Sequence, residues 1–191
     1  MNVLLIDCED SYTLNIYDYL CRIGISVEII SYAHFEADWT PNHEDAIVFS
    51  PGPNEATSYP KLLNWLEKNE KNIPILGICL GHQILGHYYG HFSINAKKAL
   101  HGVPMNIVCN PHPLFNFLDK NTMQVMPYHS LVITQNESSP LDILATNSDD
   151  EIMAFAHKTL PIAGFQFHPE SIGTPLGLEL LKAWKKWIAK K

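Results

Sequence analysis

Cys79 is the residue whose surroundings point most directly to chemistry. It follows a short apolar run at residues 73–78, which predicts a buried strand, and it precedes a helical pattern. Gly77 and Gly81 stand two residues before and after it, where a sharp strand-to-helix bend needs small residues. This spacing predicts a nucleophile elbow with a thiol in place of a hydroxyl. The helix N-terminus beside the sulfur favours the thiolate, so we expect a cysteine-centred enzyme.

A nucleophilic cysteine needs a general base, and the base needs a third group that holds its tautomer. His168 and Glu170 supply both in the segment 164–171, GFQFHPES. Residues two apart in an extended chain point to the same side, and Pro169 keeps His168 extended. With Glu170 on one imidazole nitrogen, the other nitrogen is free to meet Cys79. The His-x-Glu spacing is weak alone, but together with the elbow it predicts a Cys–His–Glu triad.

The same chemistry needs hydrogen-bond donors where negative charge develops on the substrate oxygen. The backbone N–H of Leu80, directly after the nucleophile, is one natural donor. The N–H of Gly52, in a Pro- and Gly-rich segment after a predicted strand, is the expected second donor.

The first half of the chain predicts the scaffold for these residues. Apolar runs and helical spacings alternate, which is typical of a doubly wound, mostly parallel α/β sheet with helices on both faces. In such sheets the ligand lies beyond the carboxyl ends of the strands, where Asp7, residues 50–54 and Cys79 converge. The expected strands are residues 2–6, 25–30, 46–49 and 73–78; the expected helices run from an N-cap at Asp10 or Ser11 to Gly24, over residues 59–69, and onward from Cys79.

The second half predicts a small antiparallel part made of short strands and turns. A final helix follows, with Thr174 as its N-cap and Pro175 at its first position. We interpret the lysines of that helix as a solvated face. The expected strands are residues 92–97, 103–109, 122–126, 130–134, 143–146, 153–157 and 162–167, with a helical turn over 113–118.

The composition narrows the class of protein. With 191 residues, 46% hydrophobic and 17% charged, the chain is expected to form one globular domain spanning residues 1–191. A net charge of −7 argues against nucleic acid or an anionic membrane as partner. The four cysteines form no CxxC pair and no signal-peptide pattern opens the chain, so we expect a reduced, cytoplasmic protein. No apolar run approaches the ~20 residues of a membrane span.

Four motifs stand in order along the chain: SPGP at 50–53, GICLGHQ at 77–83, YHSL at 128–131 and FHPES at 167–171. Together they resemble the class I (triad) glutamine amidotransferases, and the resemblance covers nearly the whole chain. The opening LLID at 4–7, with DSYT at 10–13 and Asn15, narrows it to subunits that serve chorismate-using synthases. These are component II of anthranilate synthase and component II of para-aminobenzoate (aminodeoxychorismate) synthase. The resemblance implies a single-domain, flavodoxin-like fold.

The resemblance also implies roles. It implies a thioester on Cys79, with His168 as acid and base and Glu170 orienting it. It implies no cofactor in this chain: Mg²⁺ is expected in the partner, a chorismate-binding synthase subunit (component I), in a heterodimer or higher heteromer. The residues implied to hold glutamine or its oxyanion are Gly52, Pro53, Asn54, Leu80, Gln83, Ser130 and Leu131.

Two positions depart from the family pattern. Asn54 stands where the family usually has Gly, and Asn tolerates a positive φ better than most residues. Val103 follows His101-Gly102 where a Lys is usual. The first departure bears on the loop beside the substrate, and the second on the coupling to the partner.

Other reactive residue types receive plainer interpretations. Cys8, Cys21 and Cys109 are read as buried or incidental thiols. His87 and His91 are four apart on one predicted helix, a spacing that metals accept, but no carboxylate or cysteine joins them at a recognisable spacing. We therefore interpret them as surface histidines and expect no metal site. His82 is interpreted as a structural residue of the elbow, and the role of His129 is left open.

These observations predict a glutaminase subunit that releases ammonia from glutamine for a chorismate-using synthase, making anthranilate, 4-amino-4-deoxychorismate or both. Three alternatives stay open at this point. The chain is the glutaminase part of another synthase, of the GMP or carbamoyl-phosphate type; or a catalytically silent docking module; or a cysteine hydrolase of another γ-glutamyl substrate.

Overall fold

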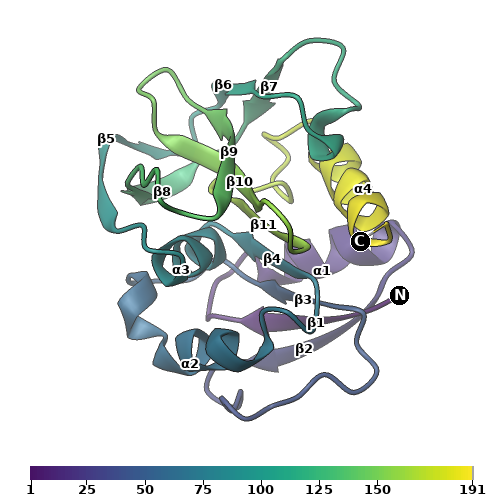
Figure 1. Ribbon diagram of the computed structural model, residues 1–191. Coiled ribbons are helices and arrows are strands. Elements are labelled where there is room, and N and C mark those ends of the chain that lie inside the picture. The colour runs from purple at the N-terminus through teal and green to yellow at the C-terminus, as the bar shows by residue number, and fades with distance from the viewer. Residues whose placement is uncertain (191) are drawn as a thin grey trace.

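A nine-stranded sheet runs through the molecule, in the order β2-β1-β3-β4-β11-β10-β9-β6-β7 (Figure 1). The computed structural model describes residues 1–190 and, at residues 99–101, the backbone alone. The strands of this sheet are β1 (Asn2–Asp7), β2 (Ser26–Ser31), β3 (Ala46–Phe49), β4 (Ile75–Ile78), β6 (Met105–Cys109), β7 (Thr122–Val125), β9 (Leu141–Thr146), β10 (Ile152–His157) and β11 (Ile162–Phe165).

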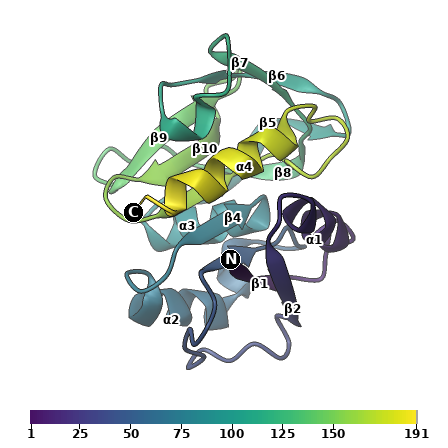
Figure 2. The same ribbon diagram turned by 90° about the vertical axis from the view of Figure 1, so that its right-hand side faces the viewer.

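The strands β2, β1, β3, β4 and β11 are parallel, and helices cover both faces of this half. Because side chains alternate along a strand, β1 supplies two cores. Val3 and Leu5 pack with α1 (Thr13–Arg22) and α4 (Gly177–Ile188), whereas Leu4 and Ile6 pack with α2 (Pro60–Asn69) and α3 (Leu80–Tyr88). Figure 2 shows α4 and α1 on the side opposite α2 and α3. The predicted doubly wound α/β architecture is confirmed.

The antiparallel strands continue the same sheet. β11 is parallel to β4 on one side and antiparallel to β10 on the other, so it joins the two halves. A separate ribbon pairs β5 (Ser93–His101) with β8 (Tyr128–Ile133), and β8 contacts α3. The ribbon therefore brings the start of β8 next to the helix that follows Cys79. The predicted antiparallel second half is present, and β11 connects it to the parallel half of the sheet.

The N-terminal capping residues predicted for two helices are wrong. α1 begins at Thr13 after Tyr12, with no side-chain cap, because the Asp10 carboxylate accepts a hydrogen bond from the Tyr12 N–H at 2.8 Å. α4 begins at Gly177, and not at Pro175. Thr174 is committed elsewhere: its Oγ1 donates to the His168 carbonyl at 2.7 Å and accepts from the Met126 N–H at 2.9 Å. Both predicted caps instead hold loops at the carboxyl edge of the sheet.

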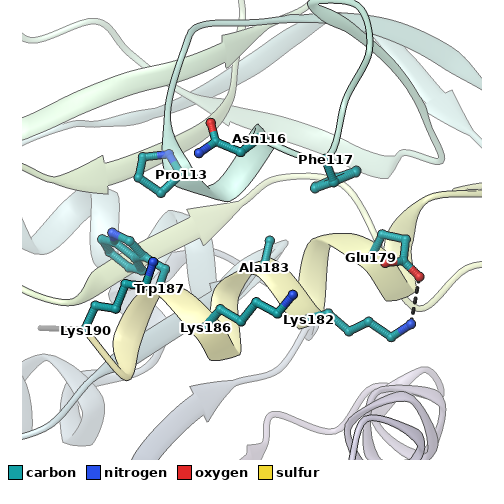
Figure 3. A pocket seen from close by; sticks show the side chains of 9 residues that line it. All are labelled: Pro113, Asn116, Phe117, Glu179, Lys182, Ala183, Lys186, Trp187 and Lys190. Carbon is teal, nitrogen blue, oxygen red and sulfur yellow. Dashed lines mark hydrogen bonds and ion pairs between the residues drawn. The ribbon is translucent and has the colours of Figure 1, made fainter.

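One lysine of the basic run on α4 has a structural role that the predicted solvated face did not include. The Lys185 ammonium donates to the carbonyls of Ile23 and Gly24, at 2.8 and 3.2 Å, and so satisfies the C-terminal end of α1. Three other lysines line a hollow of about 380 Å³ between α4 and the short helix η2 (Pro113–Phe115), shown in Figure 3. Its lining includes Lys182, which pairs with Glu179, and none of the predicted site residues.

Among the described residues, no helix combines the length and apolar character that crossing a membrane demands.

Candidate active site

Cys79 occupies the bend between β4 and α3 in a strained backbone conformation, with φ 52° and ψ −101°. Its N–H donates to the Phe165 carbonyl of β11 at 2.8 Å, which fixes the bend to the neighbouring strand. A Cβ on Gly77 would lie 2.3 Å from the Gly81 carbonyl oxygen, and one on Gly81 would lie 2.3 Å from the Phe49 carbonyl oxygen. The predicted bend is present, and close backbone approach explains both glycines. Positive φ at a non-glycine residue of this kind is concentrated at functional sites.

His168 and Glu170 are joined by a short polar contact, with Nδ1 of the imidazole 2.6 Å from Oε1 of the carboxylate. Both side chains are buried. The proximity has a different origin from the one expected, because residues 169–170 form a turn instead of extended chain. The Ser171 N–H returns to the His168 carbonyl at 3.3 Å and closes that turn. Buried charges of opposite sign need each other, so the two groups form an ion pair.

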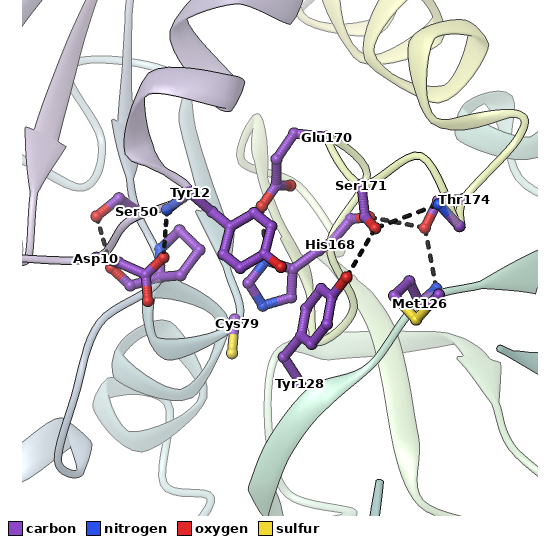
Figure 4. Close-up of polar contacts among 12 residues, drawn as sticks. Asp10, Tyr12, Ser50, Cys79, Met126, Tyr128, His168, Glu170, Ser171 and Thr174 are labelled. Atoms are coloured by element: carbon purple, nitrogen blue, oxygen red, sulfur yellow. Dashed lines mark hydrogen bonds and ion pairs between the residues drawn. The ribbon is translucent and has the colours of Figure 1, made fainter. Parts of the chain in front are cut away.

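The electrostatics of His168 follow from its neighbours. Burial alone would lower the pKa of the imidazole, but the Glu170 carboxylate and then the Cys79 sulfur raise that pKa to about 10. Nε2 of His168 makes no hydrogen bond among the described residues. Figure 4 shows the imidazole between Glu170 and Cys79. The ring is therefore an imidazolium at neutral pH, held on one side by a carboxylate and adjacent to the thiol on the other.

A pocket of about 180 Å³ opens beside the sulfur of Cys79. The loop after β3, the first turns of α3 and the start of β8 form its walls, so three segments far apart in the sequence meet there. Its ten lining residues include all seven predicted for glutamine or the oxyanion: Gly52, Pro53, Asn54, Leu80, Gln83, Ser130 and Leu131, together with Cys79, Tyr128 and His129.

Gly52 and Leu80, whose backbone N–H groups are the predicted oxyanion donors, both line this pocket. Neither N–H group donates a hydrogen bond within the described part of the chain. Gly52 is close-packed, because an added Cβ would lie 2.5 Å from Leu80 Cδ2 and 2.7 Å from the Cys8 carbonyl oxygen. Two unengaged donors beside a nucleophile are the arrangement that stabilises a developing oxyanion.

The loop that carries Gly52 is held from behind. Tyr59 donates its hydroxyl to the Pro53 carbonyl at 2.9 Å, and Ser50 Oγ accepts from the Cys8 N–H at 2.9 Å. Asn54 has φ 65°, the left-handed region that Gly adopts freely and that Asn tolerates. The Asn at this position therefore keeps the conformation available to the Gly that is usual in the family.

Two tyrosines beside His168 received no role from the sequence. The rings of Tyr12 and Tyr128 stack on each other at 4.9 Å, and each contacts the imidazole edge-on, at 5.2 and 4.9 Å (Figure 4). The Tyr128 hydroxyl lies 3.1 Å from Ser171 Oγ. No sequence pattern predicted this cover, because its two halves come from the loop before α1 and from β8.

The remaining cysteines fit their plain interpretation. Burial raises the pKa of Cys8 and of Cys109 to about 12, so both stay thiols. Cys21 is exposed on α1, and all four cysteines are free. Cys79 is the cysteine that borders the pocket beside His168.

The histidines differ from expectation in one respect. α3 ends at Tyr88, so His87 and His91 do not share a helix, and His91 is buried with Nδ1 2.6 Å from the Thr134 carbonyl oxygen. The prediction of a surface His91 is therefore wrong. His82 is fully buried against Phe155, and burial lowers its pKa to about 3.

Only one group of side chains among the described residues brings three metal-ligating atoms within 4.8 Å of one another. It consists of Glu28, His43 and Glu44, which belong to β2 and to the loop before β3. Residues 43 and 44 precede β3, whereas Cys79 follows the parallel strand β4, so this group lies toward the opposite edge of the sheet. It has no part in the site.

The fold and site together define an α/β protein with a thiol on a nucleophile elbow, beside a buried histidine–carboxylate pair. The family model "Glutamine amidotransferase class-I" matches residues 4–186. The chain belongs to the class-I glutamine amidotransferase family.

Individual relatives agree with that assignment. The chain is 37% identical over 182 residues to aminodeoxychorismate synthase component 2 of Escherichia coli, covering 94% of this chain and 96% of that protein. It is 38% identical over 202 residues to anthranilate synthase component 2 of Pseudomonas putida, covering 97% of each. The crystal structure of a glutamine amidotransferase from Thermotoga maritima superposes with a TM-score of 0.79 at 18% identity, covering 100% of this chain and 99% of that one, which supports the fold.

Proposed function

We propose that this chain is the glutaminase subunit of a chorismate-using synthase. It would release ammonia from the side-chain amide of glutamine and deliver it to a partner subunit. The observation that carries the proposal is that Cys79 and all seven residues predicted to hold glutamine or its oxyanion line one pocket. Membership in the amidotransferase family supports the substrate.

In the first half-reaction, the Cys79 thiolate attacks the amide carbon of glutamine. Its C=O electrons move onto oxygen, and the oxyanion accepts hydrogen bonds from the Gly52 and Leu80 N–H groups. His168, held as an imidazolium by Glu170, gives its proton to the leaving nitrogen. The C–N bond breaks, ammonia leaves, and a thioester remains on Cys79.

In the second half-reaction, His168 is neutral and acts as the general base. It takes a proton from water as the water oxygen attacks the thioester carbon. The C–S bond then breaks, which frees glutamate and restores the Cys79 thiolate beside a protonated His168. Glu170 keeps the imidazole in one orientation through both steps.

The partner would be the chorismate-binding component I, in a heterodimer or higher heteromer, and it would bind the Mg²⁺. The names of the component 2 relatives support this assignment. Identities of 37% and 38% do not choose between aminodeoxychorismate and anthranilate as product. We place the complex in the cytoplasm, an assignment that four free thiols support.

The test uses glutamine that carries an isotope label in its side-chain amide. The purified chain is combined with its co-expressed synthase partner and chorismate. The proposal predicts that the label appears in the amine of the product and that unlabelled glutamate is released. Product without the label would contradict the proposal. So would glutamate release by a co-purified complex whose partner subunit does not use chorismate. Growth complementation of tryptophan-requiring and para-aminobenzoate-requiring strains then identifies the product.

A further inference from the structure

Gln166 is a buried neighbour of the Cys79 sulfur. It directly follows β11 and is fully buried. Its side-chain Nε2 is 3.7 Å from the Cys79 sulfur, within hydrogen-bond range for sulfur. It is not among the residues that line the glutamine pocket. Gln166 therefore reaches the reacting atom without facing the substrate.

A chain of hydrogen bonds fixes which end of the Gln166 amide faces the sulfur. The Leu131 carbonyl can only accept, so the nitrogen of the Gln83 amide must face it, at 3.0 Å. The same Gln83 nitrogen lies 3.2 Å from Gln166 Oε1. Reversing either amide would place donor against donor or acceptor against acceptor. Gln166 consequently presents its N–H to Cys79.

We propose that Gln166 donates this N–H to the Cys79 thiolate and stabilises it, as a catalytic residue beyond the Cys79, His168 and Glu170 set. The inference rests on the proposed function, because it assigns a role at the same nucleophile. An N–H that meets a charged acceptor makes a stronger hydrogen bond than one that meets a neutral group. A neutral amide also avoids burying another charge beside His168.

The chain has a second consequence for substrate binding. Both hydrogens of the Gln83 amide are engaged, by Leu131 and by Gln166, so Gln83 can offer only its oxygen to the pocket. That oxygen has no hydrogen-bond partner among the described residues and suits a donor group of the substrate. The pocket wall at Gln83 and Leu131 is thus connected to the sulfur through Gln166.

The test compares Gln166→Met, which keeps the length but removes the donor, with Gln166→Glu, which keeps an acceptor for Gln83 but places a carboxylate beside the sulfur. Iodoacetamide reacts with thiolates, and mass spectrometry of the Cys79 peptide separates this reaction from that of exposed Cys21. At neutral pH we expect Cys79 alkylation to slow about tenfold in Gln166→Met, equivalent to about 1.4 kcal/mol. The slowing should be greater in Gln166→Glu. In the partner complex, kcat for glutamine should fall in both variants. In Gln166→Glu, which keeps the acceptor for the pocket residue Gln83, KM should stay within about twofold, because Gln166 itself does not line the pocket.

Alkylation at the wild-type rate in both folded variants would overturn the inference, as would a change confined to KM. If neither variant folds, NMR of the wild-type chain decides. The Gln166 side-chain amide signals must then shift when Cys79 is alkylated, and unshifted signals would contradict the hydrogen bond. Labelled glutamine processed normally by the wild-type complex, with unchanged alkylation in the variants, would leave the proposed function standing and remove only the role of Gln166.

Discussion

The imidazole of His168 and the carboxylate of Glu170 lie 2.6 Å apart, and both side chains are buried. Burial is the largest single influence on the pKa of His168 and lowers it, but the Glu170 charge, together with the contacts to Cys79 and Glu170, raises that pKa above its ordinary value. The group that we propose as the proton donor to departing ammonia is therefore kept charged at neutral pH mainly by Glu170, with a further contribution from Cys79.

Replacing Glu170 should change how activity depends on pH. Ammonia release requires the imidazolium form of His168, and this form is lost as pH rises through the folded pKa of about 10. In Glu170→Gln the raising charge is gone, so the basic limb of kcat/KM should move to lower pH, and kcat should fall by roughly a thousandfold. The measurement is a pH profile of glutamine-dependent synthesis by the complex. Glu179→Gln, an exposed carboxylate paired with Lys182, is the matched control and should keep the wild-type profile. An unmoved basic limb in Glu170→Gln would show that Glu170 does not hold His168 in its charged form.

The aromatic cover of His168 should matter through its rings. Tyr12→Ala removes the ring that contacts both Tyr128 and the imidazole, and we expect kcat to fall about tenfold as His168 gains freedom. Tyr12→Phe keeps both ring contacts and should stay within about twofold of wild type. Tyr17→Ala, at an exposed tyrosine of α1, controls for nonspecific damage to that helix. Steady-state kinetics decide, and an inactive Tyr12→Phe would transfer the role from the ring to the hydroxyl.

The bend at Cys79 predicts a contrast between two glycines of α3. In Gly81→Ala the added carbon would lie 2.3 Å from the Phe49 carbonyl oxygen, a backbone atom that cannot move away. We expect a loss of about 3 kcal/mol in the free energy of unfolding, together with loss of activity. In Gly86→Ala the nearest atom is the flexible tip of Ile133, at 2.8 Å, and the helix gains about 1 kcal/mol in propensity. Urea denaturation measures both, and equal losses would contradict close backbone approach as the reason for Gly81.

Much of this arrangement was predictable because local rules agree with the fold. The Cys79 bend was predictable from the spacing of its glycines, and the sheet from alternating apolar and helical patterns. The predicted caps were wrong because Asp10 accepts a local hydrogen bond from the Tyr12 N–H before the helix begins, and because Thr174 accepts from the distant Met126 N–H, which propensity does not include. The cover formed by Tyr12 and Tyr128 was missed because it joins residues more than a hundred positions apart.

The sequence patterns did not single out Gln166. It stands two residues before His168, as His168 stands two before Glu170, so the alternation used for the triad also pointed at it. Its apolar, β-prone neighbours Phe165 and Phe167 made the segment look purely structural. The direction in which the Gln166 side-chain amide faces follows only from the position of the Leu131 carbonyl in space, through its hydrogen bond to Gln83.

The buried His82 predicts acid sensitivity that is separable from catalysis. Its folded pKa of about 3 lies below the ordinary value, so its neutral form contributes stability above about pH 6.5, and this is lost as pH falls toward 3. Between pH 7 and pH 5 the loss should reach about 2 kcal/mol. In His82→Leu, urea unfolding should show a stability loss smaller by that amount over the same interval. Identical pH dependence in the two proteins would mean that His82 is not desolvated as the structure has it.

The role of Cys79 as the nucleophile is tested by comparing two nitrogen sources in the Cys79→Ala complex. Because we propose that Cys79 acts in ammonia release alone, this complex should make no product from glutamine while keeping wild-type synthesis from added ammonium. Product formation from glutamine at or near the wild-type rate would show that Cys79 is not the nucleophile.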